Sequence, residues 1–419
     1  MRNKRTLNSV LLISITSFFF SILILSTISA ASSQYIPPTL IEKRITTNPF
    51  ASLNPEIYGN KIVWQDNRSG NWDIFIFDLS TKKQIYTTNK YDQTNPDIYK
   101  DKVVWQDSRN GGSDIYLQNL TSKKQTRVTN NGKASNPRIY GDRIVWIDGL
   151  NSNSVYLYDL LTSKKTYISA CNSGADIYKD RIVWENNGIV YMYNISTSSI
   201  FEITFPPGWD DQDDYNNNLG HSNPLIYGDT IVSSFADMEG HYGLQIYDIW
   251  YSDPQMIGQI DLFGGNPVIY KDKVVWDEIR DSEYANLYIF DIPTSTETQL
   301  TFNQYYQGKA DVFENKIVWE DNRNGNWDIY MGTISYSPIA VFSASPVSGK
   351  APLKVQFIDK STGTVSSWKW SFGDKTYSTQ KNPKHTYSKP GKYTVSLTVK
   401  NAKGTNTKII SKYITVRSK

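Results

Sequence analysis

The sequence is poor in the residues that build covalent and metal-centred scaffolds. It contains one cysteine, Cys171, and three histidines in 419 residues. A single cysteine excludes an intramolecular disulfide framework and any zinc or iron-sulfur site with several cysteine ligands. No nucleophile elbow, phosphate loop, HExxH helix or dinucleotide fingerprint occurs, so catalysis has no positive support from motifs.

The sequence as a whole also lacks an excess of one charge. It has 44 basic and 41 acidic side chains, a net charge of +3. This near balance argues against a nucleic-acid binder held by a basic surface. Aromatic residues, in contrast, make up 14% of the chain and hydrophobic residues 39%. That is too much core-forming material for a disordered chain, and it favours a folded, β-rich protein.

Long apolar runs are confined to the N-terminus. Arg2, Lys4 and Arg5 precede an apolar run over residues 10–28, and Ser29-Ala30-Ala31 follows it. This layout predicts a signal peptide over residues 1–31, cleaved after Ala30 or Ala31. The run is also long enough for an uncleaved signal anchor, the only membrane attachment we expect. Either way the remainder is expected to be extracellular, secreted or at the cell surface. The sequons at Asn67, Asn119 and Asn194 are then candidate glycosylation sites.

One block recurs seven times between residues 54 and 321, beginning with NPEIYGNKIVWQD (54–66) and ending with KADVFENKIVWED (309–321). Its tryptophan position is occupied by Trp64, Trp105, Trp146, Trp184, Ser233, Trp276 and Trp319. The spacing, 38 to 49 residues, is typical of four-stranded propeller blades. The pattern predicts an all-β fold with a seven-bladed β-propeller over residues 40–336, in which the tryptophan fills the gap between blades.

In the last unit, the third predicted strand leads directly into a region without the repeat, so the unit has no fourth strand of its own. Residues 41–47 resemble the fourth strand of the first unit, residues 83–88. We therefore expect the N-terminal strand to complete the last blade, so that the ring closes without exposed sheet edges.

Two loops carry a family resemblance. Residues 66–74 (DNRSGNWDI) and 321–329 (DNRNGNWDI) resemble the D-x-R-x-G-N-x-D-I-Y signature of TolB-like propellers. The whole repeat is similar to the propellers of archaeal, methanogen-type cell-surface proteins. The resemblance implies the propeller fold.

Residues 338–419 contain no further copy of the repeat. Three spaced motifs, at residues 368–374, 382–387 and 390–399, resemble the polycystic-kidney-disease (PKD) domain. Alternation in Tyr393, Val395, Leu397 and Val399 independently predicts a strand with one buried face, as in a β-sandwich. The resemblance implies an Ig-like sandwich that acts as a spacer or adhesive module on an extracellular protein.

Three segments depart from the repeat, at residues 205–221, 237–242 and 277–284. All fall in loops expected on one face of the ring, in adjacent units, where ligand binding usually resides. The candidate ligand-binding residues are Trp209, Tyr215, His221, His241, Tyr242, Asp277 and Glu278. The aromatic side chains could stack on sugar rings, or could instead pack the long loop onto the ring.

The same patch contains a candidate calcium site. Asp210, Asp211, Asp213 and Asp214 supply the closely spaced carboxylates that Ca²⁺ prefers. The alternative is a solvated acidic loop, because the spacing is not that of an EF-hand. His221 and His241 are candidate ligands of a transition metal, although their spacing is not that of a known metal motif.

The acids repeated in several units are expected to be structural. They are Asp66, Asp107, Asp148 and Asp321, and three of them are followed two residues later by Arg68, Arg109 or Arg323. We expect each carboxylate to cap loop N–H groups and pair with its arginine, because an active site needs one asymmetric constellation. Cys171 is expected to be a small buried or loop residue.

These observations favour a non-catalytic extracellular surface protein. Its propeller face would bind a glycan, a surface-layer component or another protein of the cell envelope, with no nucleic-acid partner. One alternative is a secreted polysaccharide-active enzyme, a lyase or glycosidase, that uses carboxylates of the propeller face. A second alternative is a TolB-like component of an envelope complex.

Overall fold

The computed structural model describes residues 37–149, 153–203, 220–236, 242–249, 255–262, 265–280 and 283–418. The predicted signal peptide lies outside these ranges. Within them the one helix is the short 3-10 turn η1 (Ile292–Thr294), and no helix is long and apolar enough to cross a membrane. The prediction of an all-β protein is confirmed.

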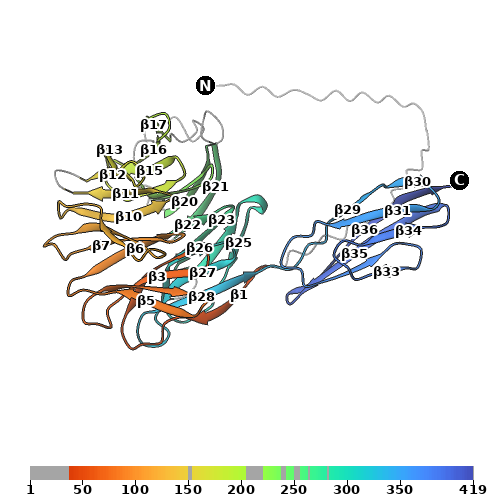
Figure 1. Cartoon of the computed structure of the whole chain (residues 1–419), viewed down its shortest axis with the longest axis horizontal. Coiled ribbons are helices and arrows are strands. Elements are labelled where there is room, and N and C mark those ends of the chain that lie inside the picture. The colour runs from red at the N-terminus through yellow and green to blue at the C-terminus, as the bar shows by residue number, and fades with distance from the viewer. Residues whose placement is uncertain are drawn as a thin grey trace, which may run out of the picture. The chain divides into compact units, whose positions relative to one another are not determined.

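The described part of the repeat region forms seven four-stranded antiparallel sheets, called sheets 1 to 7 in chain order (Figure 1). Their first strands are β2 (Ser52–Tyr58), β6 (Gln93–Tyr99), β10 (Ala134–Tyr140), β14 (Ala175–Tyr178), β18 (Gly220–Tyr227), β22 (Val268–Tyr270) and β26 (Gln307–Phe313). Their second strands, which carry the tryptophan position, are β3 (Lys61–Asp66), β7 (Lys102–Asp107), β11 (Arg143–Asp148), β15 (Arg181–Asn186), β19 (Thr230–Ala236), β23 (Lys273–Glu278) and β27 (Lys316–Asp321).

The outer half of each sheet completes the pattern. The third strands are β4 (Asp73–Asp78), β8 (Asp114–Asn119), β12 (Ser154–Asp159), β16 (Ile189–Asn194), β20 (Tyr242–Asp248), β24 (Asn286–Asp291) and β28 (Asp328–Ser335). The fourth strands are β5 (Lys83–Thr87), β9 (Gln125–Arg127), β13 (Lys164–Ala170), β17 (Ser199–Glu202), β21 (Gln255–Leu262), β25 (Thr296–Gln299) and, in sheet 7, β1 (Thr39–Arg44). β1 pairs antiparallel with β28, with Thr39 opposite Ser335 and Arg44 opposite Tyr330.

The repeated tryptophans lie between neighbouring sheets. Trp105 is fully buried and packs with Val63 and Ile74 of sheet 1. In the same way, Trp64 of sheet 1 packs with Val318 and Ile329 of sheet 7. A buried tryptophan of this size contributes much of the apolar area that holds adjacent sheets together. The predicted packing role of the tryptophan is confirmed at these positions.

Sheet 5 solves the same packing problem differently. Its tryptophan position is Ser233, which is fully buried. Between sheets 4 and 5 the space is filled by Tyr247 from the third strand, together with Val183 and Ile226. Tyr247 has no solvent exposure. A large ring is therefore kept at this junction, although it comes from a different strand.

The C-terminal residues form two further sheets. One has the order β29 (Phe342–Ser345), β31 (Leu353–Asp359) and β34 (Lys384–Tyr387). The other has the order β30 (Ser348–Lys350), β36 (Gly404–Arg417), β35 (Gly391–Asn401), β32 (Ser367–Ser371) and β33 (Tyr377–Ser378). Their shared core contains the fully buried Phe357, Trp370, Tyr387 and Leu397. The predicted alternation holds, since Val395, Leu397 and Val399 are buried.

Candidate functional site

The first strands of the sheets share a local distortion that places side-chain amides around one cavity. Asn54, Asn95, Asn136 and Asn223 have φ values of 48° to 52°, a conformation that asparagine tolerates better than most residues. A register shift follows at each, as between Leu53 and Glu56. The residue after each is proline, which has no N–H to leave unpaired in the shifted ladder. The repeated Asn-Pro pair therefore builds this edge of the cavity.

The cavity has a volume of about 340 Å³. Residues from the first strands or the segments before them, in all seven sheets, line it. The polar lining residues are Asn54, Glu56, Asn95, Asn136, Arg138, Asn223, Asn266 and Lys309. We call this the amide cavity. Amide groups both donate and accept hydrogen bonds, so such a lining suits a ligand rich in hydroxyl or amide groups.

Neighbouring sheets share hydrogen bonds at the amide cavity. The Nδ2 atom of Asn54 donates to Oδ1 of Asn95 at 3.0 Å, and Nδ2 of Asn95 donates to Oδ1 of Asn136 at 3.3 Å. The backbone N–H of Asn95 donates to Gln65 at 2.9 Å, and that of Asn136 donates to Gln106 at 3.1 Å. The glutamine that follows the tryptophan thus holds the first strand of the next sheet. These contacts fix the position of the amides before any ligand arrives.

At one side of the cavity, the position that follows the tryptophan is an acid, Glu320, where sheets 1 and 2 have Gln65 and Gln106. The backbone N–H of Asn54 donates to Oε1 of Glu320 at 2.6 Å. Burial raises the pKa of Glu320 to about 7, and the nearby Asp277 adds to this, while the N–H and Lys309 oppose it. Burial also raises the pKa of Asp277. Gly308 pairs with Glu320, and a Cβ at Gly308 would stand 3.5 Å from Oδ2 of Asp277. Both acids therefore lie next to Gly308.

Farther along the first strands than the amides, five charged side chains line the inside of the ring. Nη1 of Arg138 contacts Oε1 of Glu56 at 2.6 Å. Asp97, Asp176 and Asp311 each accept the backbone N–H of Ile139, Ile226 or Ile57 in the following sheet, at 2.6 to 2.9 Å. Burial, followed by the charge of Glu56, raises the pKa of Asp97 to about 7. Within the described ranges, no group of three or more His, Cys, Asp or Glu side chains is arranged to hold a metal ion.

The opposite ends of the first strands carry a cluster of aromatic side chains. Its seven rings make a closed cycle of contacts with centroid distances of 4.6 to 5.0 Å. They are Tyr58, Tyr99, Tyr140, Tyr178, Tyr227, Tyr270 and Phe313. They line a smaller cavity of about 230 Å³. The cycle passes from sheet 7 back to sheet 1 through Tyr58 and Phe313, so the first strands surround one axis.

The loops on the amide side carry exposed aromatic side chains. Phe50, Tyr91, Phe302, Tyr305 and Tyr306 all lie in connections that lead into a first strand, and all are exposed. These connections are tied to the loops between second and third strands. Ala51, for example, donates its N–H to Asn67 Oδ1 at 3.0 Å, and Asn322 donates its N–H to the Tyr306 carbonyl at 3.2 Å. The predicted placement of both loop types on one face agrees with these bonds.

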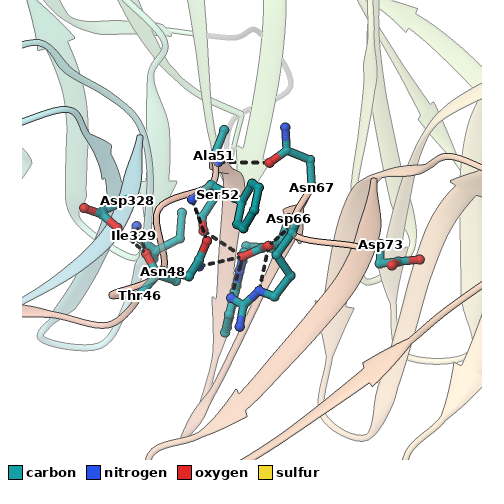
Figure 2. Close-up of polar contacts among 12 residues, drawn as sticks. Thr46, Asn48, Ala51, Ser52, Asp66, Asn67, Asp73, Asp328 and Ile329 are labelled. Carbon is teal, nitrogen blue, oxygen red and sulfur yellow. Dashed lines mark hydrogen bonds and ion pairs between the residues drawn. The ribbon is translucent and has the colours of Figure 1, made fainter. Parts of the chain in front are cut away.

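On this face, the repeated acid is bound by its arginine and by the tryptophan N–H two residues before it (Figure 2). We call this arrangement the clamp. Asp66 accepts hydrogen bonds from Arg68 Nε at 2.8 Å, Trp64 Nε1 at 3.2 Å and Ser52 Oγ at 2.8 Å. Arg68 also lies over the Phe75 ring, 4.2 Å from its centroid. Burial alone opposes ionisation of Asp66, but the hydrogen bonds outweigh it and hold its pKa below the usual range. The expected structural role of this pair is confirmed.

The structure describes four of the predicted site residues. Trp209, Asp210, Asp211, Asp213, Asp214, Tyr215 and His241 lie outside the described residues. Asp277 lies beside the amide cavity as described above, and Tyr242 is 48% exposed in β20.

The other two predicted site residues are buried. Glu278 forms a clamp in sheet 6, where it accepts from Trp276 Nε1 at 3.1 Å and Arg280 Nε at 3.1 Å. His221 has its Nδ1 3.3 Å from Ser233 Oγ, and burial lowers its pKa to about 4. It is therefore held as a neutral imidazole at neutral pH.

The remaining candidates have local structural contacts. The side chains of Asn67, Asn119 and Asn194 each accept a backbone N–H, from Ala51, Ser122 and Ser196. Cys171 is buried, and burial raises the pKa of its thiol to about 11. It is therefore a small core residue, as expected. The amides of the cavity were missed by motif reasoning, although Asn-Pro recurring in five units was a visible signal.

Comparisons with known proteins support both parts of this architecture. Residues 337–416 match the PKD domain family. Collagenase ColA of Bacillus cereus is 45% identical over 67 residues, which are 15% of this chain and 7% of the collagenase. The chain thus spans a small fraction of that relative's length.

Solved structures address the repeat region. The β-propeller domain of the Trilobed protease from Pyrococcus furiosus has a TM-score of 0.52 and 13% identity, covering 70% of this chain and 96% of that one. TolB from Acinetobacter baumannii has a TM-score of 0.42 and 15% identity, covering 57% and 62%. The likeness to the Trilobed protease domain, together with the seven four-stranded sheets, shows a β-propeller fold, and a PKD domain follows it. The PKD domain suggests an extracellular module.

Proposed function

We propose that this protein is a non-catalytic extracellular surface protein whose propeller binds a polyhydroxylated ligand, a glycan, at the amide cavity. Surface-layer components and envelope proteins that carry such glycans are the partners we expect. The PKD domain would present the propeller as a spacer or adhesive module. The observation that carries the proposal is the amide cavity, with its fixed amides and the exposed aromatic loops on the same face.

The ring geometry makes this cavity a natural site. We infer a seven-bladed ring closed by the N-terminal strand, supported by the pairing of β1 with β28 and by the closed cycle of aromatic contacts. A volume of about 340 Å³ lies at the lower end of the range for small-molecule pockets. It suits one or two sugar rings. Exposed aromatic rings nearby offer flat apolar faces to the C–H groups of further sugars.

A glycan and polysaccharide array with the fragment beginning at Ser32 tests the proposal, with product analysis of every binder. The variant Asn136→Gly removes one cavity amide and keeps a residue that tolerates the positive φ. Ser163→Gly changes another positive-φ position, in a loop between third and fourth strands. We expect binding to weaken at least about tenfold in Asn136→Gly and to stay unchanged in Ser163→Gly. Equal binding by all three proteins would overturn the proposal.

A second candidate function is polysaccharide cleavage. Glu320 and Asp277 favour it, because a buried acid with a pKa near 7 next to a second acid is the pairing that acid-base catalysis on sugars uses. Shortened or unsaturated products from the array, lost in Glu320→Gln, would support this function. Binding without products would support the non-catalytic one.

A further inference from the structure

The near-neutral net charge of the chain hides two oppositely charged parts. Residues 337–419 contain 15 basic and 2 acidic side chains, a net charge of +13. Residues 37–336 contain 26 basic and 39 acidic side chains, a net charge of −13. The small net charge of the whole chain argued against a basic surface. It is small because the large net charges of these two parts cancel. The PKD domain is a strongly basic unit.

The positive charge of the PKD domain is exposed and uncompensated. Thirteen of the fourteen described Lys and Arg side chains in this domain are exposed, and Lys403 is half-buried. Over residues 337–418, none of them forms an ion pair with a carboxylate. The two acids are already engaged, Asp374 with His385 at 2.7 Å and Asp359 with Trp368 Nε1 at 2.8 Å. The lysines therefore remain available to an external anion.

The outer face of the five-stranded sheet gathers these charges next to hydroxyl groups. Lys369 in β32 is opposite Thr398 in β35, which is opposite Thr407 in β36. Lys400 lies in the next outward-facing row of that face, opposite Ser367 and Thr405. The Oγ1 atoms of Thr398 and Thr407 are 2.8 Å apart. Cations and hydroxyl groups thus lie side by side on the sheet surface.

An exposed ring lies on the same face. Tyr377 in β33 is opposite Ser371, two residues along from Lys369, and it is 64% exposed. The Lys369 Nζ atom is 6.0 Å from the centroid of its ring. A flat ring beside an ammonium group suits a sugar that carries a carboxylate or sulfate, because the ring contacts the sugar face while the lysine meets the charge.

The basic residues are almost all lysines, with Arg417 as the one arginine in the domain. Arginine is the residue that recognises phosphate in a bidentate, planar geometry, whereas lysine acts as a compact point charge. A lysine-coated sandwich with charges on both sheets therefore fits a flexible polymer with distributed anionic groups better than one shaped phosphate site.

Lys392 is exposed and lies farther along β35 on the same face, opposite Thr415 in β36. We propose that this outer face of the PKD sheet, with Lys369, Lys400 and Tyr377 at one end and Lys392 toward the other, is a binding surface for acidic polysaccharide. The PKD domain then attaches the protein to anionic glycan, in addition to spacing the propeller. This inference does not depend on the amide cavity, because the two surfaces lie on different domains and are tested by different variants.

The full chain from Ser32 is titrated with heparin, with polygalacturonate and with neutral dextran at several salt concentrations. Three proteins are compared with wild type. K369Q/K392Q/K400Q removes three charges from the proposed surface, and K369R/K392R/K400R keeps them. K83Q/K124Q/K164Q removes three exposed lysines from the propeller. Circular dichroism and melting temperature verify that all four proteins are folded.

We expect wild type to bind both acidic polymers and not dextran, with affinity that falls as salt rises. The PKD glutamine variant is expected to bind at least about tenfold more weakly, and its log-log salt slope to fall by about two to three. The arginine variant and the propeller variant are expected to bind within about twofold of wild type. Tyr377→Ala is expected to weaken polygalacturonate binding about fivefold without changing the salt slope.

Several outcomes overturn the proposal. Equal binding by wild type and the PKD glutamine variant would remove the surface assignment. Tighter binding of a short DNA duplex or of phosphatidylserine vesicles, measured at the same salt, would replace the polysaccharide by a nucleic acid or a membrane. Salt-sensitive self-association without polymer binding would make a second copy of the acidic propeller the partner.

Discussion

The ring contains two kinds of sheet that solve one packing problem with different chemistry. In sheets 6, 7, 1 and 2 the tryptophan N–H reaches an acid two residues on, and an arginine closes the contact from the other side. We call these the clamped sheets. In sheets 3 and 4, within the described part of the chain, Trp146 Nε1 and Trp184 Nε1 are buried without a partner. Sheet 5 has no tryptophan at this position.

The difference shows that apolar burial of the tryptophan accompanies sheet formation with or without the clamp. Trp184 is as deeply buried as Trp64, and both sheets form the same four strands. The clamp is therefore not required to make a sheet. The clamped sheets follow one another in the ring, and the loops they support carry Phe50, Tyr91, Tyr305 and Tyr306. The acid of the clamp also binds the connection before the first strand, as Asp66 does through Asn48 and Ser52.

The largest effect is expected from removing a clamped tryptophan. Trp105→Ala deletes a fully buried ring and the donor to Asp107. We expect a loss of roughly 3 to 5 kcal/mol in the free energy of unfolding, measured by denaturant titration. Trp105→Phe should also cost more than Trp184→Phe, because only the first removes a hydrogen bond, the one that Trp105 Nε1 donates to Asp107. Equal costs for the two phenylalanine variants would show that the indole hydrogen bond adds nothing.

Removing only the arginine tests the clamp itself. Arg109→Met keeps the side-chain bulk over Tyr116 but leaves Asp107 with fewer donors. We expect a loss of roughly 2 to 3 kcal/mol at pH 7, since a buried carboxylate loses its cation. Burial opposes ionisation of Asp107, and the bonds from Arg109 and Trp105 outweigh it to lower its pKa.

The sign of the pH effect at this clamp follows from the lowered pKa. Stability gained from a lowered carboxyl pKa is present above the unfolded pKa and is lost as the pH falls through the folded one. Arg109→Met should therefore flatten the decline in stability below about pH 4. Melting curves from pH 2 to 7 measure this, and Arg68→Met in sheet 1 should behave in the same way. A parallel decline in wild type and variant would contradict the assignment.

A smaller effect is expected at Glu320, where sheet 7 has an acid at the position that is glutamine in sheets 1 and 2. Gln65 and Gln106 accept the N–H of the next sheet, and Glu320 does so at the junction with sheet 1. The pKa of Glu320 is raised to about 7, so folding becomes less favourable as the pH rises from about 4.5 to 7. Glu320→Gln should therefore stabilise the protein by roughly 1 to 3 kcal/mol at pH 8 and have little effect at pH 4.

Gln65→Glu supplies the reverse test. It should make sheet 1 sensitive to the same pH range as the Glu320 junction. Thermal unfolding of both variants at pH 4 and pH 8 provides the measurement. A stabilisation by Glu320→Gln that is the same at both pH values would show that ionisation of Glu320 is not its cause.

The smallest effect is expected outside the clamped sheets. Replacing Asp210, Asp211, Asp213 and Asp214 with asparagine should lower thermal stability by a few degrees only in calcium-containing buffer, because Ca²⁺ binding stabilises the state that holds it. The same shift in the presence of a chelator would remove the calcium prediction. This prediction rests on the sequence alone.

Much of the fold was predictable because it depends on local, repeated signals. The alternating strands, the tryptophan spacing and the pairing of acid with arginine each recur in several units, so one observation supports the next. The PKD motifs could be recognised for the same reason. Glu278, in contrast, was predicted as a ligand residue although it belongs to a clamp, because its loop sequence departs from the repeat while its position does not.

The sequence by itself determined the order of strands, the buried tryptophan positions and the basic composition of the last eighty residues. Only the tertiary structure decided which residues from different units meet. The amide cavity, the Glu320 and Asp277 pair and the aromatic cycle each combine side chains more than thirty residues apart. Their pKa values and geometry arise from burial between sheets, a property of the assembled ring that no single repeat contains.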